Sequence, residues 1–207
     1  MTPRLPTNPF ATRFTRPGVL PPLDRHGNPI DTARLVRSLQ PGAVVVLEGP
    51  HGHGKSNLLA ALLAAAQAGG RETLLVRMRT GLDAWKAVAA ALTAPRRACL
   101  GCDGWERCPP GTTAIIRGIA AVRRLSVIVT AHGPLGLPVL ARCGTSARLL
   151  AALVARLPGH GDLIDGHDID DAFTKHAGNL REALYDLYDR FERRIRERCL
   201  AAQTTAG

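Results

Sequence analysis

The residues best suited to chemistry lie in one short glycine-rich segment, residues 49–56, which reads GPHGHGKS. Its glycines allow the backbone to turn tightly and to point N–H groups inward, where they can bind phosphate oxygens. Lys55 adds a positive charge for the outer phosphates of a nucleotide, and the Ser56 hydroxyl is a suitable ligand for the accompanying Mg²⁺. The segment therefore predicts a phosphate-binding loop, with ATP as the expected ligand.

The predicted nucleotide-binding residues are consecutive in the chain. They are Gly49, Pro50, His51, Gly52, His53, Gly54, Lys55, Ser56 and Asn57. His51 and His53 occupy variable positions of the loop, where a side chain either contacts phosphate or points to solvent. An apolar stretch at 43–47 precedes the loop, and an Ala- and Leu-rich helix at 55–68 follows it. The positive end of that helix dipole would face the same phosphates, so the context supports the motif.

A second group of reactive residues follows another apolar stretch, in segment 98–106, which reads ACLGCDGWE. ATP hydrolysis needs an acidic residue near Mg²⁺ and commonly a second group that orients the attacking water. Asp103 ends the apolar run, and we expect it to hold Mg²⁺ with Ser56, partly through water. Glu106 is either the catalytic base or a surface residue that pairs with Arg107.

Strands and helices alternate through the middle of the chain, which is typical of a parallel sheet covered on both faces. The predicted strands are residues 43–47, 73–78, 98–102, 126–130 and 139–142, and the predicted helices between them are 55–68, 82–92 and 113–123. The predicted fold class is therefore α/β: a P-loop NTPase with three α/β/α layers and a five-stranded parallel sheet, followed by a small C-terminal helical lid.

The sequence divides into four regions. They are a proline-rich arm with a short helix at 1–40, the P-loop α/β core at 41–143, the helical lid at 144–200 and a tail at 201–207. The lid is expected to contain helices at 145–157, 168–176 and 179–200, because apolar residues recur there at three- and four-residue steps.

Composition restricts the environment in which the protein works. Apolar residues make up 45% of the chain and charged residues 21%, as in ordinary globular domains. The N-terminal segment has no apolar signal region, and no apolar run reaches the roughly 18 residues of a membrane span. We therefore expect a cytoplasmic protein without a membrane partner.

The cysteines and the net charge each allow two interpretations. Cys99, Cys102 and Cys108 could be zinc ligands, but a fourth ligand is missing and the first two read as small apolar residues of a buried strand. The net charge of +10 comes almost entirely from arginine. It reflects either a surface for nucleic acid or a coding bias.

The chain resembles the AAA+ and STAND group of P-loop ATPases from about residue 42 to 195. DGWE at 103–106 resembles the second acidic motif of STAND proteins. SVIVT at 126–130 resembles a strand that ends in a polar sensor of the γ-phosphate, which implies that role for Thr130. GNLRE at 178–182 resembles the motif that opens a lid helix, which implies that Arg181 reaches the nucleotide.

The resemblance implies an ATP-binding protein, a Mg²⁺-dependent ATP hydrolase that acts as a nucleotide-controlled switch or remodeller. ATP and Mg²⁺ are the expected cofactors, while a homo-oligomer and a protein partner remain open. Phe10, Phe14 or the arm at 17–23 would cover the adenine, or the arm would simply wrap the core. Two other functions remain open. One is a nucleic-acid-associated ATPase that uses Arg193, Arg194 and Arg196, and the other is a P-loop small-molecule kinase.

Overall fold

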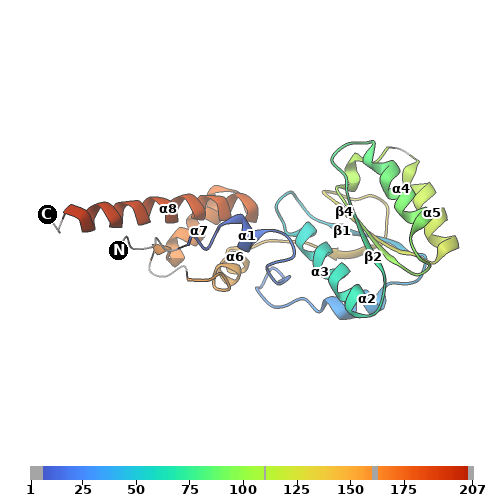
Figure 1. Cartoon of the computed structure of the whole chain (residues 1–207), viewed down its shortest axis with the longest axis horizontal. Helices are drawn as coiled ribbons and strands as arrows, with labels where there is room; N and C mark the ends of the chain where they lie inside the picture. The colour runs from blue at the N-terminus through green and yellow to red at the C-terminus, as the bar shows by residue number, and fades with distance from the viewer. Residues whose placement is uncertain (1–6, 110, 160–162, 205–207) are drawn as a thin grey trace.

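The computed structural model describes residues 7–109, 111–159 and 163–204. Residues 1–6 of the predicted arm and 205–207 of the predicted tail lie outside this part. Figure 1 shows an elongated molecule, with a sheet and its helices at one end and a group of helices at the other. The last helix of the chain extends away from the sheet.

The sheet has five parallel strands in the order β2-β3-β4-β1-β5. The strands are β1 (Val44–Glu48), β2 (Thr73–Arg77), β3 (Cys99–Asp103), β4 (Ser126–Ala131) and β5 (Val139–Arg142). Every residue of β1 and β4 is buried, because helices cover both faces of the sheet. Cys99 and Cys102 lie fully buried in β3. The predicted α/β fold with a five-stranded parallel sheet is thus confirmed.

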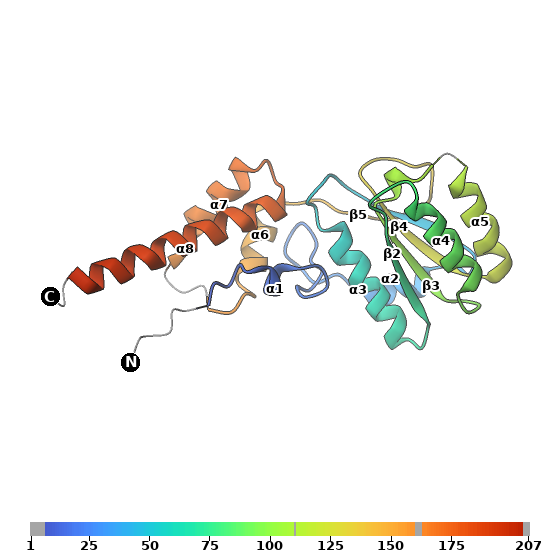
Figure 2. The same ribbon diagram turned by 45° about the horizontal axis from the view of Figure 1, so that its top comes forward.

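Two pairs of helices form the outer layers (Figure 2). They are α2 (Thr32–Ser38), α3 (Lys55–Ala68), α4 (Asp83–Thr93) and α5 (Thr112–Arg123). Val45 and Leu47 of β1 pack in one apolar cluster with side chains of α2 and α3. Val44 and Val46 point to the other face and pack in a second cluster with α4 and α5. The two-residue period of a strand therefore divides β1 between two cores.

A third apolar cluster lies among the C-terminal helices α6 (Ala147–Val154), α7 (Gly166–Lys175) and α8 (Leu180–Thr204). Phe10 of the arm is 1% exposed, and its ring centroid lies 6.2 Å from that of Phe191 in α8. Helix α8 continues beyond the predicted end at residue 200, so the expected tail begins inside this helix. Within the described ranges, no helix has both the length and the apolar character needed to cross a lipid bilayer.

The arm before β1 links the helical group to the core, and it is not extended throughout. The short helix α1 (Thr12–Thr15) interrupts it. Asn8 Nδ2 donates hydrogen bonds to a backbone carbonyl and to the Glu192 carboxylate of α8, at 3.1 and 3.0 Å. Further along, the Gly18 N–H donates to Asn57 Oδ1 of α3 at 2.8 Å. The arm is therefore hydrogen-bonded both to the C-terminal helices and to the α/β core.

Buried charge joins α7 to α8. Asp168 of α7 is 4% exposed and accepts hydrogen bonds from the guanidinium groups of Arg190 and Arg194. Arg194 is the main cause that lowers the pKa of Asp168 to about 2. Arg190 also pairs with Asp186 at 2.7 Å. One of the arginines considered for nucleic-acid binding, Arg194, is therefore part of the internal packing of the helical group.

Candidate functional site

The segment GPHGHGKS forms the loop between β1 and α3, at the carboxyl end of the parallel sheet. Gly54 is the N-cap of α3 and has a left-handed backbone with φ of 81°. The first N–H groups of α3 have no carbonyl partner within the helix and face this loop. A helix N-terminus of this kind attracts anions, and Lys55 is its first residue.

Lys55 is a buried cation, with 7% of its surface exposed. Its Nζ donates hydrogen bonds to the carbonyl oxygens of Gly49 and Pro50, at 2.6 and 2.7 Å. Burial lowers the pKa of Lys55, and the positive charge of Arg181 lowers it further. No carboxylate forms an ion pair with Lys55 in the part of the chain that the structure describes. A buried positive charge that forms no ion pair fits an incoming phosphate.

Asp103, at the end of β3, joins the loop to the centre of the sheet. Its Oδ1 accepts hydrogen bonds from Ser56 Oγ at 2.9 Å and from Thr130 Oγ1 at 2.7 Å. The Thr130 hydroxyl in turn accepts a hydrogen bond from the Gly104 N–H at 2.8 Å. Strand β4 lies between β1 and β3, and this order places Thr130 next to Asp103. Hydroxyl and carboxylate oxygens are the ligands that Mg²⁺ prefers, so the pair Ser56 and Asp103 fits that ion.

Glu106 and two histidines border the same end of the sheet. Glu106 lies in the 3₁₀ helix η1 (Trp105–Arg107), and its Oε1 is 3.6 Å from Nε2 of His132. The His132 ring packs edge-on against the ring of His51 in the loop, with 5.4 Å between centroids. The negative charge of Glu106 also raises the pKa of Lys55, opposite to the effect of burial. The structure therefore places Glu106 beside the loop, within 3.6 Å of His132, whose ring packs on His51 of the loop.

The N-terminus of α8 touches the phosphate-binding loop. Asn179 caps this helix by accepting hydrogen bonds from the N–H groups of Arg181 and Glu182, at 3.1 and 3.3 Å. A Cβ atom on Gly52 would lie 1.9 Å from Asn179 Oδ1, so only glycine allows this contact. Gly52 also has a φ of 76°, which is strained for other residues. The position of the helical group is therefore tied directly to the loop.

A pocket of about 180 Å³ opens beside the loop. Complete small-molecule sites usually measure about 300–1,000 Å³, so this pocket suits one part of a larger ligand. Its apolar walls come from three separate regions. They include Pro21, Pro22, Leu23, Leu149, Leu153 and Leu180. His53 and Gly54 of the loop form another side, and burial lowers the pKa of His53, which favours its neutral form.

The structure brings some of the expected site residues together and places others elsewhere. Lys55, Ser56, Asp103 and Thr130 lie together, with Glu106 at their edge. Arg181 is the second residue of α8, the helix whose cap contacts the loop, and it is exposed. The Asn57 side chain is instead held by the arm, since its amide oxygen accepts a hydrogen bond from the Gly18 N–H and its amide nitrogen donates one to the Leu20 carbonyl. Phe10 is buried among the C-terminal helices and cannot cover a base, because no part of its ring is free.

Sequence reasoning missed two neighbours of the loop. Asn179 lies at the start of the last predicted helix, but nothing in its local sequence indicates that it rests on Gly52. Cys143, just after β5, lies beside Gly49 of the loop, since a Cβ atom on Gly49 would lie 2.5 Å from the Cys143 carbonyl oxygen, and burial raises the pKa of its thiol to about 11. Its position after the last strand was the only available signal, because residues at the carboxyl ends of parallel strands meet at one edge.

A parallel five-stranded sheet, a glycine-rich loop from β1 into α3 and an acidic residue at the end of β3 define a P-loop NTPase-like fold. No protein-family model matches the sequence, and no curated protein matches it. Among solved structures, the chain is similar to PCH-2 of C. elegans, with 12% identity and a TM-score of 0.39. That alignment covers 79% of this chain and 66% of the other, slightly less than two thirds.

Proposed function

We propose that this chain binds ATP with Mg²⁺ and hydrolyses it, and that it acts as a nucleotide-controlled switch of AAA+/STAND type. The observation that carries the proposal is the Asp103 carboxylate, which bonds both to Ser56 of the loop and to Thr130 of the central strand. Such a carboxylate links the Mg²⁺ position to a group that faces the outer phosphate. The buried charge of Lys55 beside it supplies the attraction for that phosphate.

Each residue has a role that follows from its surroundings. Lys55 Nζ would exchange its two carbonyl partners for phosphate oxygens. The negative charge of these oxygens would stabilise the buried ammonium. Ser56 and Asp103 would hold Mg²⁺, which neutralises charge on the phosphates when it is bound. The apolar pocket lined by Pro21 and Leu153 would receive the base.

The hydrolysis role falls on the polar edge of the site. Glu106 would orient water and accept its proton. Its charge acts on Lys55, and its carboxylate is not hydrogen-bonded to Ser56 or Thr130, which both donate to Asp103. His132 lies 3.6 Å from it and would hold the carboxylate in place. The Thr130 hydroxyl is hydrogen-bonded to Asp103 and to the Gly104 N–H. A change of its partners when the phosphate is released would therefore alter the contacts of strand β4 with η1.

The switch element in this proposal is the N-terminus of α8. Asn179 lies on Gly52, and the Arg181 charge already acts on Lys55. An additional negative charge at the loop would attract Arg181, whereas its loss would leave two cations, Arg181 and Lys55, to repel each other. The angle of the helical group would therefore follow the state of the nucleotide.

The test is nucleotide affinity, measured by the fluorescence of a methylanthraniloyl-labelled ATP with and without Mg²⁺, together with phosphate release. Lys55→Ala should lose at least tenfold in affinity, because the buried cation is gone. Glu106→Gln should bind ATP normally but release phosphate at least tenfold more slowly. Arg181→Ala should lower the affinity, while Arg193→Ala, an exposed arginine further along the same helix, should not.

The variants separate binding from hydrolysis. Equal ATP affinity in the wild type and Lys55→Ala would contradict the proposal as a whole. Normal binding with no phosphate release in the wild type would contradict only the hydrolysis step and leave a nucleotide-binding switch. A loss of affinity in Arg193→Ala equal to that in Arg181→Ala would contradict the role of the helical group.

A further inference from the structure

The outer surface of α4 and α5 exposes several large apolar side chains. They are Leu82, Trp85 and Leu92 on α4 and its N-cap, and Ile115 and Val122 on α5. Leu82 is 77% exposed, Val122 73% and Trp85 61%. These five are half of the ten exposed large apolar side chains in the described residues. We call this surface the α4–α5 face. Such a concentration on one surface indicates a contact site.

The two helices present these residues on one continuous surface. Ala84, Ala87, Val88 and Ala91 are buried against the sheet, so the opposite side of α4, with Trp85, faces outward. Ile116 and Ala120 bury the inner side of α5 in the same cluster. The helices lie next to each other over one face of the sheet in both ribbon views (Figures 1 and 2). The exposed apolar residues of the two helices therefore belong to one neighbouring pair of helix surfaces.

Gly118 lies on this surface, in the middle of α5. A glycine inside a helix destabilises it by about 0.5–1 kcal/mol relative to alanine. A Cβ atom at Gly118 would meet nothing within 4 Å, so the packing of this chain does not require glycine. A backbone that approaches α5 closely from outside would require it. This is a second observation, independent of the apolar residues, that points to a partner.

The charges around the α4–α5 face have one sign. Asp83, the single acidic residue of the two helices, is buried, and Lys86 pairs with it at 2.7 Å. The rim carries the exposed arginines Arg96, Arg97, Arg117 and Arg124, and within the described residues none of these forms an ion pair. Arg96 adjoins the apolar surface directly, because it donates a hydrogen bond to the Val122 carbonyl at 3.3 Å.

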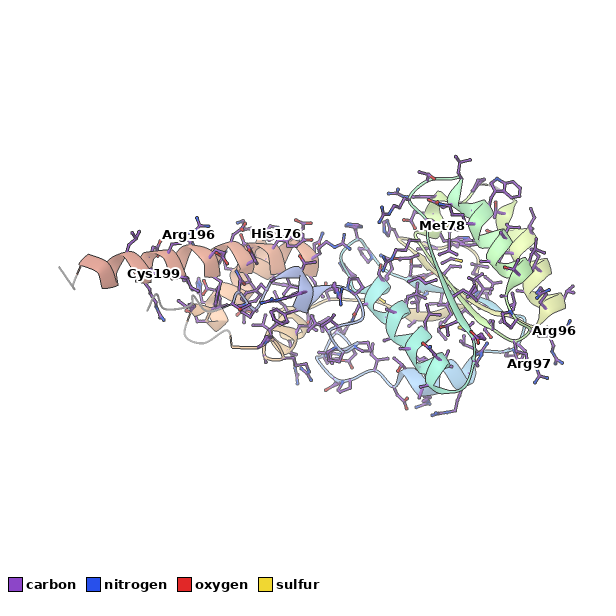
Figure 3. The ribbon with its side chains drawn as sticks, viewed as in Figure 1. Met78, Arg96, Arg97, His176, Arg196 and Cys199 are labelled. Atoms are coloured by element: carbon purple, nitrogen blue, oxygen red, sulfur yellow. The ribbon has the colours of Figure 1, made fainter. Side chains whose placement is uncertain are left out.

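Figure 3 shows Arg96 and Arg97 side by side at the end of the molecule remote from Cys199 of α8. An apolar surface with a basic rim is complementary to a surface with an apolar centre and acidic edges. A second copy of the chain docked by the same face would bring arginine to arginine, which is unfavourable. Nucleic acid would leave Trp85, Leu82 and Val122 without apolar partners, since most of its contacts are to phosphate and sugar.

We propose that the α4–α5 face binds an amphipathic helix of a partner protein, whose apolar side packs across the exposed apolar residues of α4 and α5 and whose flanking residues are Asp or Glu. Trp85 would be the main anchor, because a large exposed aromatic side chain gains the most on burial. Gly118 would allow the close approach of the partner helix, and Arg96 and Arg124 would pair with its acidic residues.

The test uses the full chain and a display library of random 20-residue peptides. Selection against the wild type should enrich peptides with apolar residues at i, i+3, i+4 and i+7 and a net negative charge. A synthetic copy of an enriched peptide without tryptophan should shift the Trp85 emission to shorter wavelength. Trp85→Ala and Gly118→Leu should each weaken its binding at least tenfold.

Gly118→Leu makes the test independent of misfolding, because the space above Gly118 is open and a leucine there should leave the melting temperature unchanged or raise it. Tyr185→Ala, which removes an exposed aromatic residue of α8, is the matched control and should bind normally. Failure to enrich any peptide, enrichment of basic peptides, or normal binding to Gly118→Leu would each overturn the proposal. Trp85-dependent self-association or Trp85-dependent DNA binding would overturn it as well, because each would show another occupant.

Discussion

Replacement of Thr130 by valine tests the centre of the site, because valine has the same shape but no hydroxyl. Thr130 is 1% exposed, and its Oγ1 donates to Asp103 and accepts from the Gly104 N–H. Loss of a hydrogen bond to a charged group destabilises a protein by about 1.5–3 kcal/mol, and an unpaired N–H by about 1–3 kcal/mol. The added methyl group returns about 0.8 kcal/mol. We expect Thr130→Val to lower the free energy of unfolding by about 2–4 kcal/mol.

The assay is urea unfolding followed by the fluorescence of Trp105, which is buried and directly follows Gly104. Thr130→Ser keeps the hydroxyl and should lose about 1 kcal/mol, the value of one buried methyl group. Phosphate release should fall in Thr130→Val and persist in Thr130→Ser. The reasoning would be refuted if the two variants unfolded at the same urea concentration, since the hydroxyl bonds would then contribute nothing.

Three further predictions concern the contacts of the helical group and the arm. Gly52→Ala should destabilise the chain by about 2–3 kcal/mol through backbone strain and loss of the Asn179 cap. The double variant with Asn179→Ala should be no less stable than Gly52→Ala alone. If the losses of the two single variants add in urea unfolding, the contact is contradicted. The pKa of Asp168 falls from 3.8 unfolded to about 2 folded. Its contribution, about 1–2 kcal/mol with partial solvent screening, should therefore be complete above pH 4 and disappear as the pH falls through about 2, and Asp168→Asn should lack this acid dependence. Asn57→Ala should free the arm near Gly18, seen as faster limited proteolysis there than in the wild type; unchanged cleavage would argue against the anchor.

The sequence by itself determined the order of the elements and the chemistry of the loop. Strands such as β1, which begins Val-Val-Val-Leu, contain continuous apolar runs, because both faces of a parallel sheet are buried, and such runs are visible without any contact information. GPHGHGKS specifies a loop through local backbone requirements, and those depend only on neighbouring residues. The alternation of strands and helices then leaves few arrangements, so the five-stranded parallel sheet could be predicted.

Only the tertiary structure decided which groups meet. Thr130 and Asp103 become partners because β4 lies between β1 and β3, and strand order depends on packing between residues far apart in the chain. The same applies to Phe10, which looked available to a base but fills the core of the C-terminal helices. Asn179 on Gly52 and the exposed side of α4 with Trp85 are also results of packing. Sequence patterns report which residues prefer burial, whereas the choice of partner is made by the whole chain at once.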